Sequence, residues 1–135
     1  MELHDEVGDW HTGDILDGND LRRLVQTTMS RYVSVVRDAN GLREAISILT
    51  SALEAMPAGS FRKDDWTLGN MALSSLAIAC AGLNRQESRG AHFRSDFPDT
   101  NPELDGVHFS LVARPGEDDL WIAGSLDAAR AQATA

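Results

Sequence analysis

Residues 71–83 read Met-Ala-Leu-Ser-Ser-Leu-Ala-Ile-Ala-Cys-Ala-Gly-Leu, a run of apolar and small side chains without a single charge. The uncharged stretch extends back to Trp66 and follows Asp64 and Asp65, two acids that favour a helix N-terminus. The pattern predicts a helix from about Asp64 to Arg89. Because this helix is apolar nearly all round, we expect other segments to cover it on most sides.

Two amphipathic helices are predicted upstream. The first runs from about Asp20 to Arg37 with Asn19 or Asp20 as its cap, and the second follows a short break at 38–41 with Asn40 as its cap. Connections this short make consecutive helices antiparallel neighbours. The fold class is therefore mainly α, an antiparallel three-helix bundle of the spectrin-repeat kind. The first buried stripe comprises Leu21, Leu24, Val25, Thr28, Met29, Tyr32, Val33 and Val36. The second comprises Leu42, Ala45, Ile46, Leu49, Leu53 and Met56.

An extended segment follows the third helix. Residues 107–112 alternate apolar and polar side chains, which predicts a strand, and the Pro-Gly-Glu-Asp sequence at 115–118 predicts a turn into a second strand at 119–123. A lone hairpin is marginally stable in water, so we expect it to lie against the helices. The third helix could instead be covered by the rest of a larger protein or by a second copy of this chain.

Four segments are predicted along the chain. They are an acidic arm or connector at 1–18, the three-helix bundle at 19–98, an extended segment with a possible small β-hairpin at 99–124, and a tail at 125–135.

The overall charge and the cysteine content exclude several classes of function. A formal net charge of −9 opposes nucleic-acid binding and binding to an anionic membrane. The single cysteine, Cys80, rules out an internal disulfide and a multi-cysteine metal site. Residues 1–20 hold seven acids and no Lys or Arg, the reverse of a signal peptide, which favours a cytoplasmic protein. The uncharged run at 66–83 is long enough for a membrane helix, but its polar residues and glycines favour a buried helix of a soluble bundle.

The candidate site is the polar stretch that follows the third helix. Residues 85–96 contain three arginines, one histidine and two acids. One interpretation is internal ion pairing, with Arg85 and Arg89 four residues apart on a helix. The other is a docking surface, in which Arg89 and His92 are buried against a partner domain and donate to backbone carbonyls, while Gly90 supplies a positive φ. The candidate docking residues are Arg85, Glu87, Ser88, Arg89, Gly90, His92, Arg94 and Asp96.

Familiar catalytic patterns are absent from the sequence. Ser88, His92 and Asp96 are the residue types of a hydrolase triad, but no G-x-S-x-G motif accompanies them. The four histidines do not follow the H-E-x-x-H spacing, and neither G-x-G-x-x-G nor a P-loop occurs. We therefore predict no catalytic, cofactor-binding or metal residue in this chain.

Two segments carry a family resemblance. The sequence Glu-Ser-Arg-Gly-Ala-His at 87–92, followed by Arg94 and by Asp-Phe-Pro at 96–98, resembles the C-terminal motif of the succinate dehydrogenase, fumarate reductase and L-aspartate oxidase flavoproteins. Residues 33–45 resemble the V-x-V-x-R-x-x-x-G-L-x-x-A pattern that joins the first two helices in that family. The resemblance spans roughly residues 20–114. The short final segment is more similar to the L-aspartate oxidase branch than to the longer succinate dehydrogenase tail.

The resemblance implies a function for a larger enzyme. In this family the helical bundle packs on an FAD-binding domain, and the catalytic and FAD-binding residues lie upstream, so this chain alone is expected to be inactive and to hold no cofactor. An L-aspartate oxidase converts L-aspartate to iminoaspartate and passes the electrons through FAD to oxygen or fumarate. This step opens NAD biosynthesis, with quinolinate synthase as the pathway neighbour. The alternatives are the equivalent domain of a fumarate reductase or succinate dehydrogenase, and a freestanding helical module that forms a homodimer through its third helix.

Overall fold

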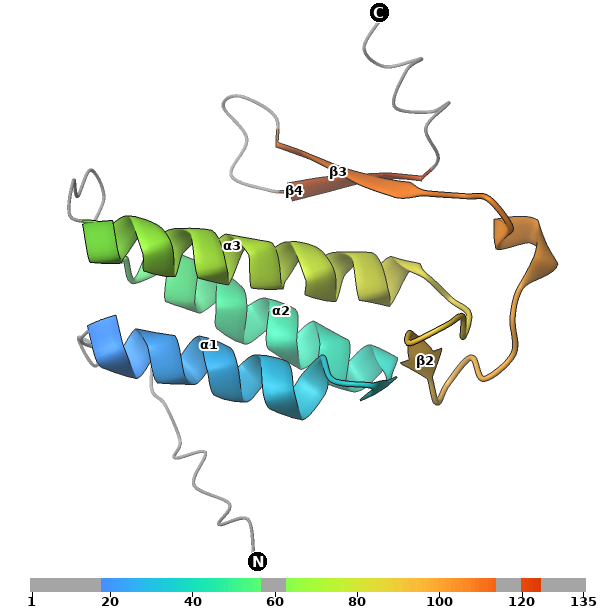
Figure 1. The fold of residues 1–135 in the computed structure, drawn as a ribbon, viewed down its shortest axis with the longest axis horizontal. Coiled ribbons are helices and arrows are strands. Elements are labelled where there is room, and N and C mark those ends of the chain that lie inside the picture. Colours follow the sequence, from blue (N-terminus) through green and yellow to red (C-terminus); the bar gives the residue numbers. More distant parts are fainter. Residues whose placement is uncertain (1–17, 57–62, 114–119, 125–135) are drawn as a thin grey trace, which may run out of the picture.

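Three antiparallel helices form the body of the molecule (Figure 1). The computed structural model describes residues 18–56, 63–113 and 120–124. Helix α1 spans Gly18–Tyr32, α2 spans Ala39–Glu54 and α3 spans Lys63–Asn84. The predicted fold class is confirmed. The predicted arm, apart from Gly18, lies outside the described residues. The predicted tail and the predicted turn at 115–118 also lie outside them, and the segment boundaries stay predictions.

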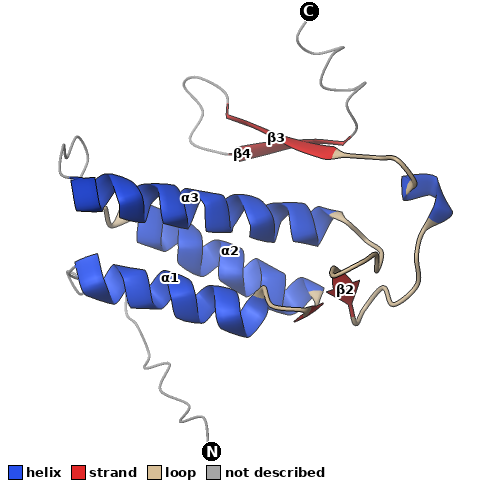
Figure 2. Ribbon diagram, in the orientation of Figure 1, coloured by secondary structure: helices blue, strands red, loops and turns tan. Residues whose placement is uncertain are grey.

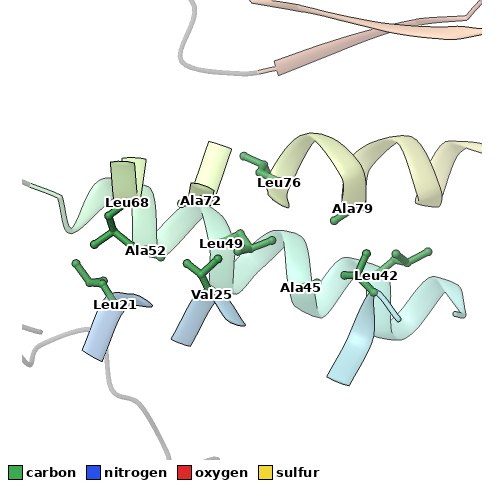
Figure 3. Packing of buried hydrophobic residues seen from close by; sticks show 11 residues of the cluster. Leu21, Val25, Leu42, Ala45, Leu49, Ala52, Leu68, Ala72, Leu76 and Ala79 are labelled. Carbon is green, nitrogen blue, oxygen red and sulfur yellow. The ribbon is translucent and has the colours of Figure 1, made fainter. Parts of the chain in front are cut away.

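The hydrophobic core lies between the three helices (Figure 3). Helix α1 contributes leucine and valine side chains, and α2 and α3 each contribute two leucines and two small alanines. These small residues let α2 and α3 pack closely, since a Cβ added to Gly82 would lie 3.4 Å from Cδ2 of Leu42. The buried hydrophobic residues are Leu21, Val25, Val33, Leu42, Ala45, Leu49, Ala52, Leu68, Ala72, Leu76 and Ala79.

Helix α1 ends earlier than predicted. It stops at Tyr32, and Val36–Arg37 forms strand β1 instead of a last helical turn. Strand β1 pairs in parallel with β2, Phe93–Arg94, which lies more than fifty residues further along the chain. The prediction that Val36 belongs to the buried stripe of the first helix is therefore wrong. Its β-branched side chain is exposed on the strand, and the pairing partner could not be seen from local periodicity.

The ends of α2 and α3 also differ from the prediction. Asp38, not Asn40, caps α2, and its Oδ1 accepts the backbone amides of Asn40 and Gly41 at 2.9 Å each. Helix α3 ends at Asn84, five residues before the predicted Arg89. Its last carbonyls are satisfied by a side chain from the following loop, so no further helical turn is needed.

The C-terminal segment folds back on the bundle (Figure 2). After a short 3₁₀ helix, η1, at Pro102–Leu104, strands β3 (Phe109–Ala113) and β4 (Leu120–Gly124) form an antiparallel hairpin. Leu111 lies opposite Ile122 in its register. The hairpin contacts α3, as expected, and so supplies part of the cover that this helix requires.

Helix α3 meets the length and composition criteria for a membrane-spanning helix, as the core helix of a bundle also can. Among the described residues it contacts α1, α2 and both strands of the hairpin. Trp66, Leu73 and Ile78 nevertheless remain exposed on it. The arrangement is that of a core helix with an incompletely covered outer surface.

Candidate domain-docking site

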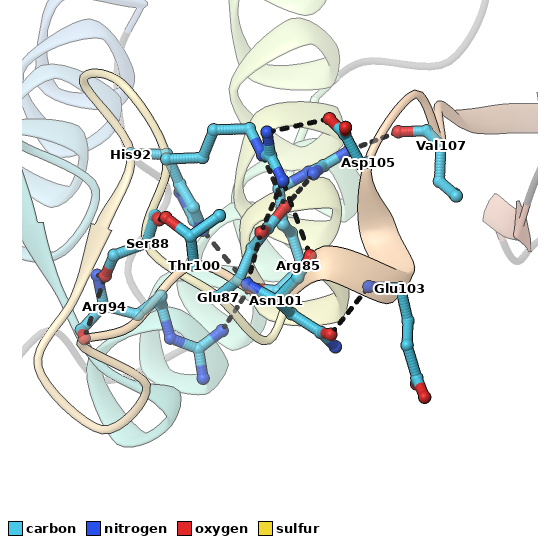
Figure 4. Close-up of polar contacts among 11 residues, drawn as sticks. Arg85, Glu87, Ser88, His92, Arg94, Thr100, Asn101, Glu103, Asp105 and Val107 are labelled. Atoms are coloured by element: carbon cyan, nitrogen blue, oxygen red, sulfur yellow. Dashed lines mark hydrogen bonds and ion pairs between the residues drawn. The ribbon is translucent and has the colours of Figure 1, made fainter.

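The predicted site residues lie at one end of the bundle, in the loop that leaves α3 (Figure 4). This loop passes β2 at Phe93–Arg94 and then reaches η1 at Pro102–Leu104. Its polar side chains form two connected groups, one around Glu87 and one around Arg94, which we call the polar network. Two of the charged side chains, Glu87 and Arg94, are fully buried.

Glu87 is the centre of the first group. One of its carboxylate oxygens accepts from Nη1 of Arg85 and from Nε of Arg89 at 3.1 Å. The other accepts from Nη2 of Arg89 at 3.2 Å and from the backbone amide of Asn101 at 2.9 Å. The hydrogen bonds from Arg89, followed by those from Asn101 and Arg85, lower the pKa of Glu87 to about 2 against the opposing effect of burial. Glu87 is therefore a fixed anion that ties three segments of the loop together.

The two arginines of this group reach further. Arg89 also pairs with Asp105 at 3.1 Å, and the hydrogen bond to Glu87 raises the pKa of Arg89. Arg85 donates to the carbonyl of Val107, and its guanidinium lies 5.1 Å from the ring centroid of Phe109. These contacts join the loop to η1 and to the start of the hairpin.

Arg94 connects two helix ends. Its Nη1 donates to the carbonyls of Gly82 at 2.8 Å and Leu83 at 3.1 Å, at the C-terminus of α3. Its Nε and Nη2 each donate to Asp96 at 2.7 Å, a bidentate pair. Asp96 in turn accepts the backbone amide of Ala39, the first residue of α2, at 3.1 Å. Arg94 thus stabilises the negative C-terminal end of α3, and Asp96 stabilises the positive N-terminal end of α2.

The ion pair with Arg94 also decides the charge of Asp96. The hydrogen bonds from Arg94, and then the one from the Ala39 amide, lower the pKa of Asp96 to about 2, although burial opposes this shift.

Ser88 and Gly90 shape the loop backbone. The Ser88 hydroxyl accepts the Arg94 amide at 2.8 Å and donates to the carbonyl of Phe97 at 2.8 Å. Gly90 has φ +59°, in agreement with its predicted positive φ, at a turn that Arg89 and His92 close with two backbone hydrogen bonds of 2.8 and 3.0 Å.

His92 links the loop to the connection between α1 and α2. Nη1 of Arg37 donates to its Nδ1 at 2.9 Å, because a guanidinium has no acceptor. The neutral ring therefore carries its proton on Nε2, which donates to the carbonyl of Arg85 at 3.2 Å. Burial, and then the charges of Arg37, Arg94 and Arg85, lower the pKa of His92.

The structure settles some details of the two interpretations of this stretch. Internal pairing occurs, but not between turns of a helix, because α3 ends before Arg85. The main donor to the carbonyls at the helix end is Arg94, where Arg89 was predicted. His92 does donate to a backbone carbonyl, as predicted. Docking of these eight residues against another domain remains a proposal.

Sequence reasoning missed three participants of the polar network. They are Arg37, Asn101 and Asp105. Arg37 occupies the arginine position of the V-x-V-x-R pattern, so a signal for it was present. Asn101 contributes to Glu87 through its backbone amide, which no sequence pattern marks.

The buried polar side chains of the described residues are engaged with one another and with the backbone. Ser88, His92 and Asp96 each contact different partners, so they form no triad. Among the described residues, no group of three or more His, Cys, Asp or Glu side chains could hold a metal ion. Within the same ranges, every buried side-chain nitrogen and oxygen has a hydrogen-bond partner. Burial raises the pKa of the Cys80 thiol, which disfavours it as a nucleophile.

Comparison with known proteins gives consistent matches. The family model described as fumarate reductase flavoprotein C-term matches residues 22–126. An L-aspartate oxidase of Rhodospirillum rubrum is 40% identical over 78 residues, which are 58% of this chain and 26% of that protein. An L-aspartate oxidase of Mycobacterium leprae is 39% identical over 82 residues, 61% of this chain and 15% of that protein. The fumarate reductase flavoprotein subunit of Mycobacterium tuberculosis is 31% identical over 113 residues, 76% of this chain and 19% of the subunit.

A solved structure supports the fold. Mycobacterium smegmatis Sdh1, in complex with UQ1, superimposes with a TM-score of 0.65 at 24% identity, over 81% of this chain and 20% of that chain. This chain therefore spans about a quarter or less of the length of the relatives it matches.

Proposed function

The chain belongs to the fumarate reductase flavoprotein C-terminal family, and from this membership we propose that it is the helical C-terminal domain of an FAD-dependent L-aspartate oxidase. The proposal is that it packs on the FAD-binding domain of the enzyme and is inactive alone. Identity of about 40% to two L-aspartate oxidases, over 78 and 82 residues, is the observation that carries it.

The described residues show no feature that fits FAD. The sequence has no G-x-G-x-x-G motif, and every buried side-chain nitrogen and oxygen in the described ranges has a hydrogen-bond partner within the chain. FAD would be held by the upstream part of such an enzyme and would supply the redox chemistry there. The role proposed for this chain is to complete and stabilise the protein around that site.

The wider setting is part of the same proposal. We infer that the parent enzyme is cytoplasmic and that its iminoaspartate is consumed in NAD biosynthesis by quinolinate synthase. The equivalent domain of a fumarate reductase is the second candidate, because the Mycobacterium tuberculosis subunit matches a longer part of the chain.

The test supplies the missing part of the enzyme in trans. The M. leprae L-aspartate oxidase and the M. tuberculosis fumarate reductase flavoprotein subunit are each truncated before the matched segment and purified with FAD. We expect this chain to co-elute with the oxidase fragment and to increase hydrogen peroxide production from L-aspartate. The intact enzymes, which retain their own C-terminal segments, serve as controls and should not bind it.

Two results would change the assignment. Binding only to the fumarate reductase fragment, with succinate or fumarate as the reacting compound, would favour the second candidate. Failure to bind either fragment, together with formation of a tight homodimer, would favour a freestanding helical module.

A further inference from the structure

Exposed apolar side chains occur in and beside the β1–β2 pair. The described residues include seven exposed large hydrophobic side chains, and four of them lie in two short segments, 35–36 and 93–97. Their exposed fractions are 65% for Val35, 61% for Val36, 39% for Phe93 and 36% for Phe97. We call these four residues the β1–β2 patch. The other three are on α3.

The strand register explains why Val36 and Phe93 face outward together. Val36 lies opposite Phe93 and Arg37 lies opposite Arg94 in the parallel ladder. Because side chains alternate along a strand, the first pair faces one side and the arginines face the other. Arg94 is 1% exposed and forms part of the polar network, so its side is the interior. Val36 and Phe93 are therefore adjacent on the outer side.

The polar network holds this patch in a fixed shape. Arg94 is bonded to Asp96 and to the end of α3, and both Phe93 and Phe97 lie within three residues of it in the chain. The ring of Phe97 lies 5.1 Å from the Arg94 guanidinium. A surface fixed in this way loses little conformational freedom when it binds, so more of the contact energy appears as affinity.

The residues around the patch are polar. Ser34 precedes the first segment, Ser95 and Asp96 lie between Phe93 and Phe97 in the second, and all three are exposed. An apolar centre with a polar margin is the usual composition of a protein–protein contact surface.

We infer that the β1–β2 patch is the surface on which this domain docks against the flavin-binding part of its own parent polypeptide. The inference rests on the proposed function and adds the face and the residues that make the contact. The patch lies inside the segment 22–126 that matches the family model. The two L-aspartate oxidases are about four to seven times longer than the part aligned with this chain.

The small size of the patch favours a covalently linked neighbour over a second copy of this chain. A stable interface between separate proteins buries about 800 Å² on each partner. Four side chains, two on the strands and two beside them, supply only part of such an area. A neighbouring domain of the same polypeptide needs less contact area because its effective concentration is high.

The test compares two pairs of substitutions in this chain. One variant carries Val36→Ser and Phe93→Ser, and the matched control carries Leu73→Ser and Ile78→Ser on α3. Both pairs replace exposed apolar side chains, and urea unfolding should show that each variant retains the midpoint of the original chain. Binding to the FAD-loaded M. leprae oxidase fragment is measured by titration calorimetry. The β1–β2 variant should raise Kd by at least about tenfold, and the α3 variant should leave it unchanged.

A chimera gives the same comparison within one polypeptide. Residues 20–113 replace the matched segment of the intact M. leprae enzyme, and the temperature at which FAD is released is followed by flavin fluorescence. The β1–β2 substitutions should lower this temperature, whereas the α3 substitutions should not.

The outcomes separate this inference from the proposed function. If the chain binds the fragment and only the α3 variant weakens binding, the docking face is wrong while the proposed function stands. If neither the fragment nor the chimera accepts the domain, the proposed function fails as well. If sedimentation shows a homodimer of the chain that the β1–β2 substitutions dissociate, the occupant of the patch is a second copy and the inference is overturned.

Discussion

Replacement of Arg94 by methionine should be the most destabilising single change in the polar network. Methionine has a similar length and can fill the space, but it has no donor. The substitution leaves Asp96 without its bidentate partner and leaves the Gly82 and Leu83 carbonyls without the Nη1 donor. Ala39 remains the other donor to the carboxylate.

The expected loss follows from these contacts. Removal of one member of a buried charge pair costs about 3–5 kcal/mol, and the lower part of this range applies because the Asp96 side chain is 30% exposed and can be rehydrated. We expect the free energy of unfolding to fall by about 3–4 kcal/mol, a large share of the roughly 5–15 kcal/mol typical of a domain. Arg94→Lys should lose about half as much, because an ammonium can reach the carbonyls or the carboxylate but cannot match both.

Urea unfolding of the 135-residue chain, followed by circular dichroism at pH 7, measures the effect. With a denaturant slope of about 2 kcal/mol per molar, the midpoint of Arg94→Met should fall by about 1.5–2 M. Arg43→Met replaces an exposed arginine of α2 and should change stability by less than about 0.5 kcal/mol. A loss of less than about 1 kcal/mol for Arg94→Met, or equal stability of the Lys and Arg proteins, would refute the role assigned to the guanidinium fork.

Three further predictions concern the same loop. Folding lowers the pKa of His92, so the unfolded chain binds the proton more readily and stability should decline as pH falls below about 6.5. The measurement is a pH series of urea midpoints, from which His92→Gln should remove this decline. The pKa of Glu87 falls to about 2 on folding, so its contribution to the free energy of unfolding is complete above about pH 4.5 and is lost towards pH 2. Glu87→Gln should be less stable at pH 7, and its stability should depend less on pH in this acid range. An unchanged acid profile would contradict the assignment. Gly90→Ala should cost about 1–2 kcal/mol in thermal unfolding because φ is +59°, whereas Gly90→Asn should cost less, and equal losses would point to crowding instead of backbone strain.

The three-helix bundle could be predicted because its signals are local. Leu21, Val25, Leu42 and Leu49 recur at helical spacing, and each is buried in the structure. The hairpin also followed from alternation near residues 107–112 and the turn sequence after it. These patterns require no knowledge of which distant residue is the partner.

The helix ends were predicted less well because distant contacts determine them. Strand β2 recruits Val36–Arg37 from what would otherwise be the last turn of α1, and Arg94 satisfies the carbonyls of α3. Both effects depend on residues far along the chain.

The same limit applies to the site. The density of arginine and acid identified the correct segment, but the complete burial of Glu87 and Arg94 opposes the usual exposure of charged side chains. Glu87 is stabilised by the side chains of Arg85 and Arg89, and Arg94 by Asp96 and by carbonyls of α3, and sequence spacing does not reveal these partners.

The ion pair of Arg94 and Asp96 has a consequence for how the domain is completed during synthesis. The ribosome makes all three helices before it adds the two residues that bind the end of α3 and the start of α2. A nascent chain that stops before residue 93 lacks both contacts, so the last carbonyls of α3 and the Ala39 amide remain open to water. Arg94 and Asp96 therefore complete the domain last, and a prematurely terminated product should be degraded more readily than the finished domain.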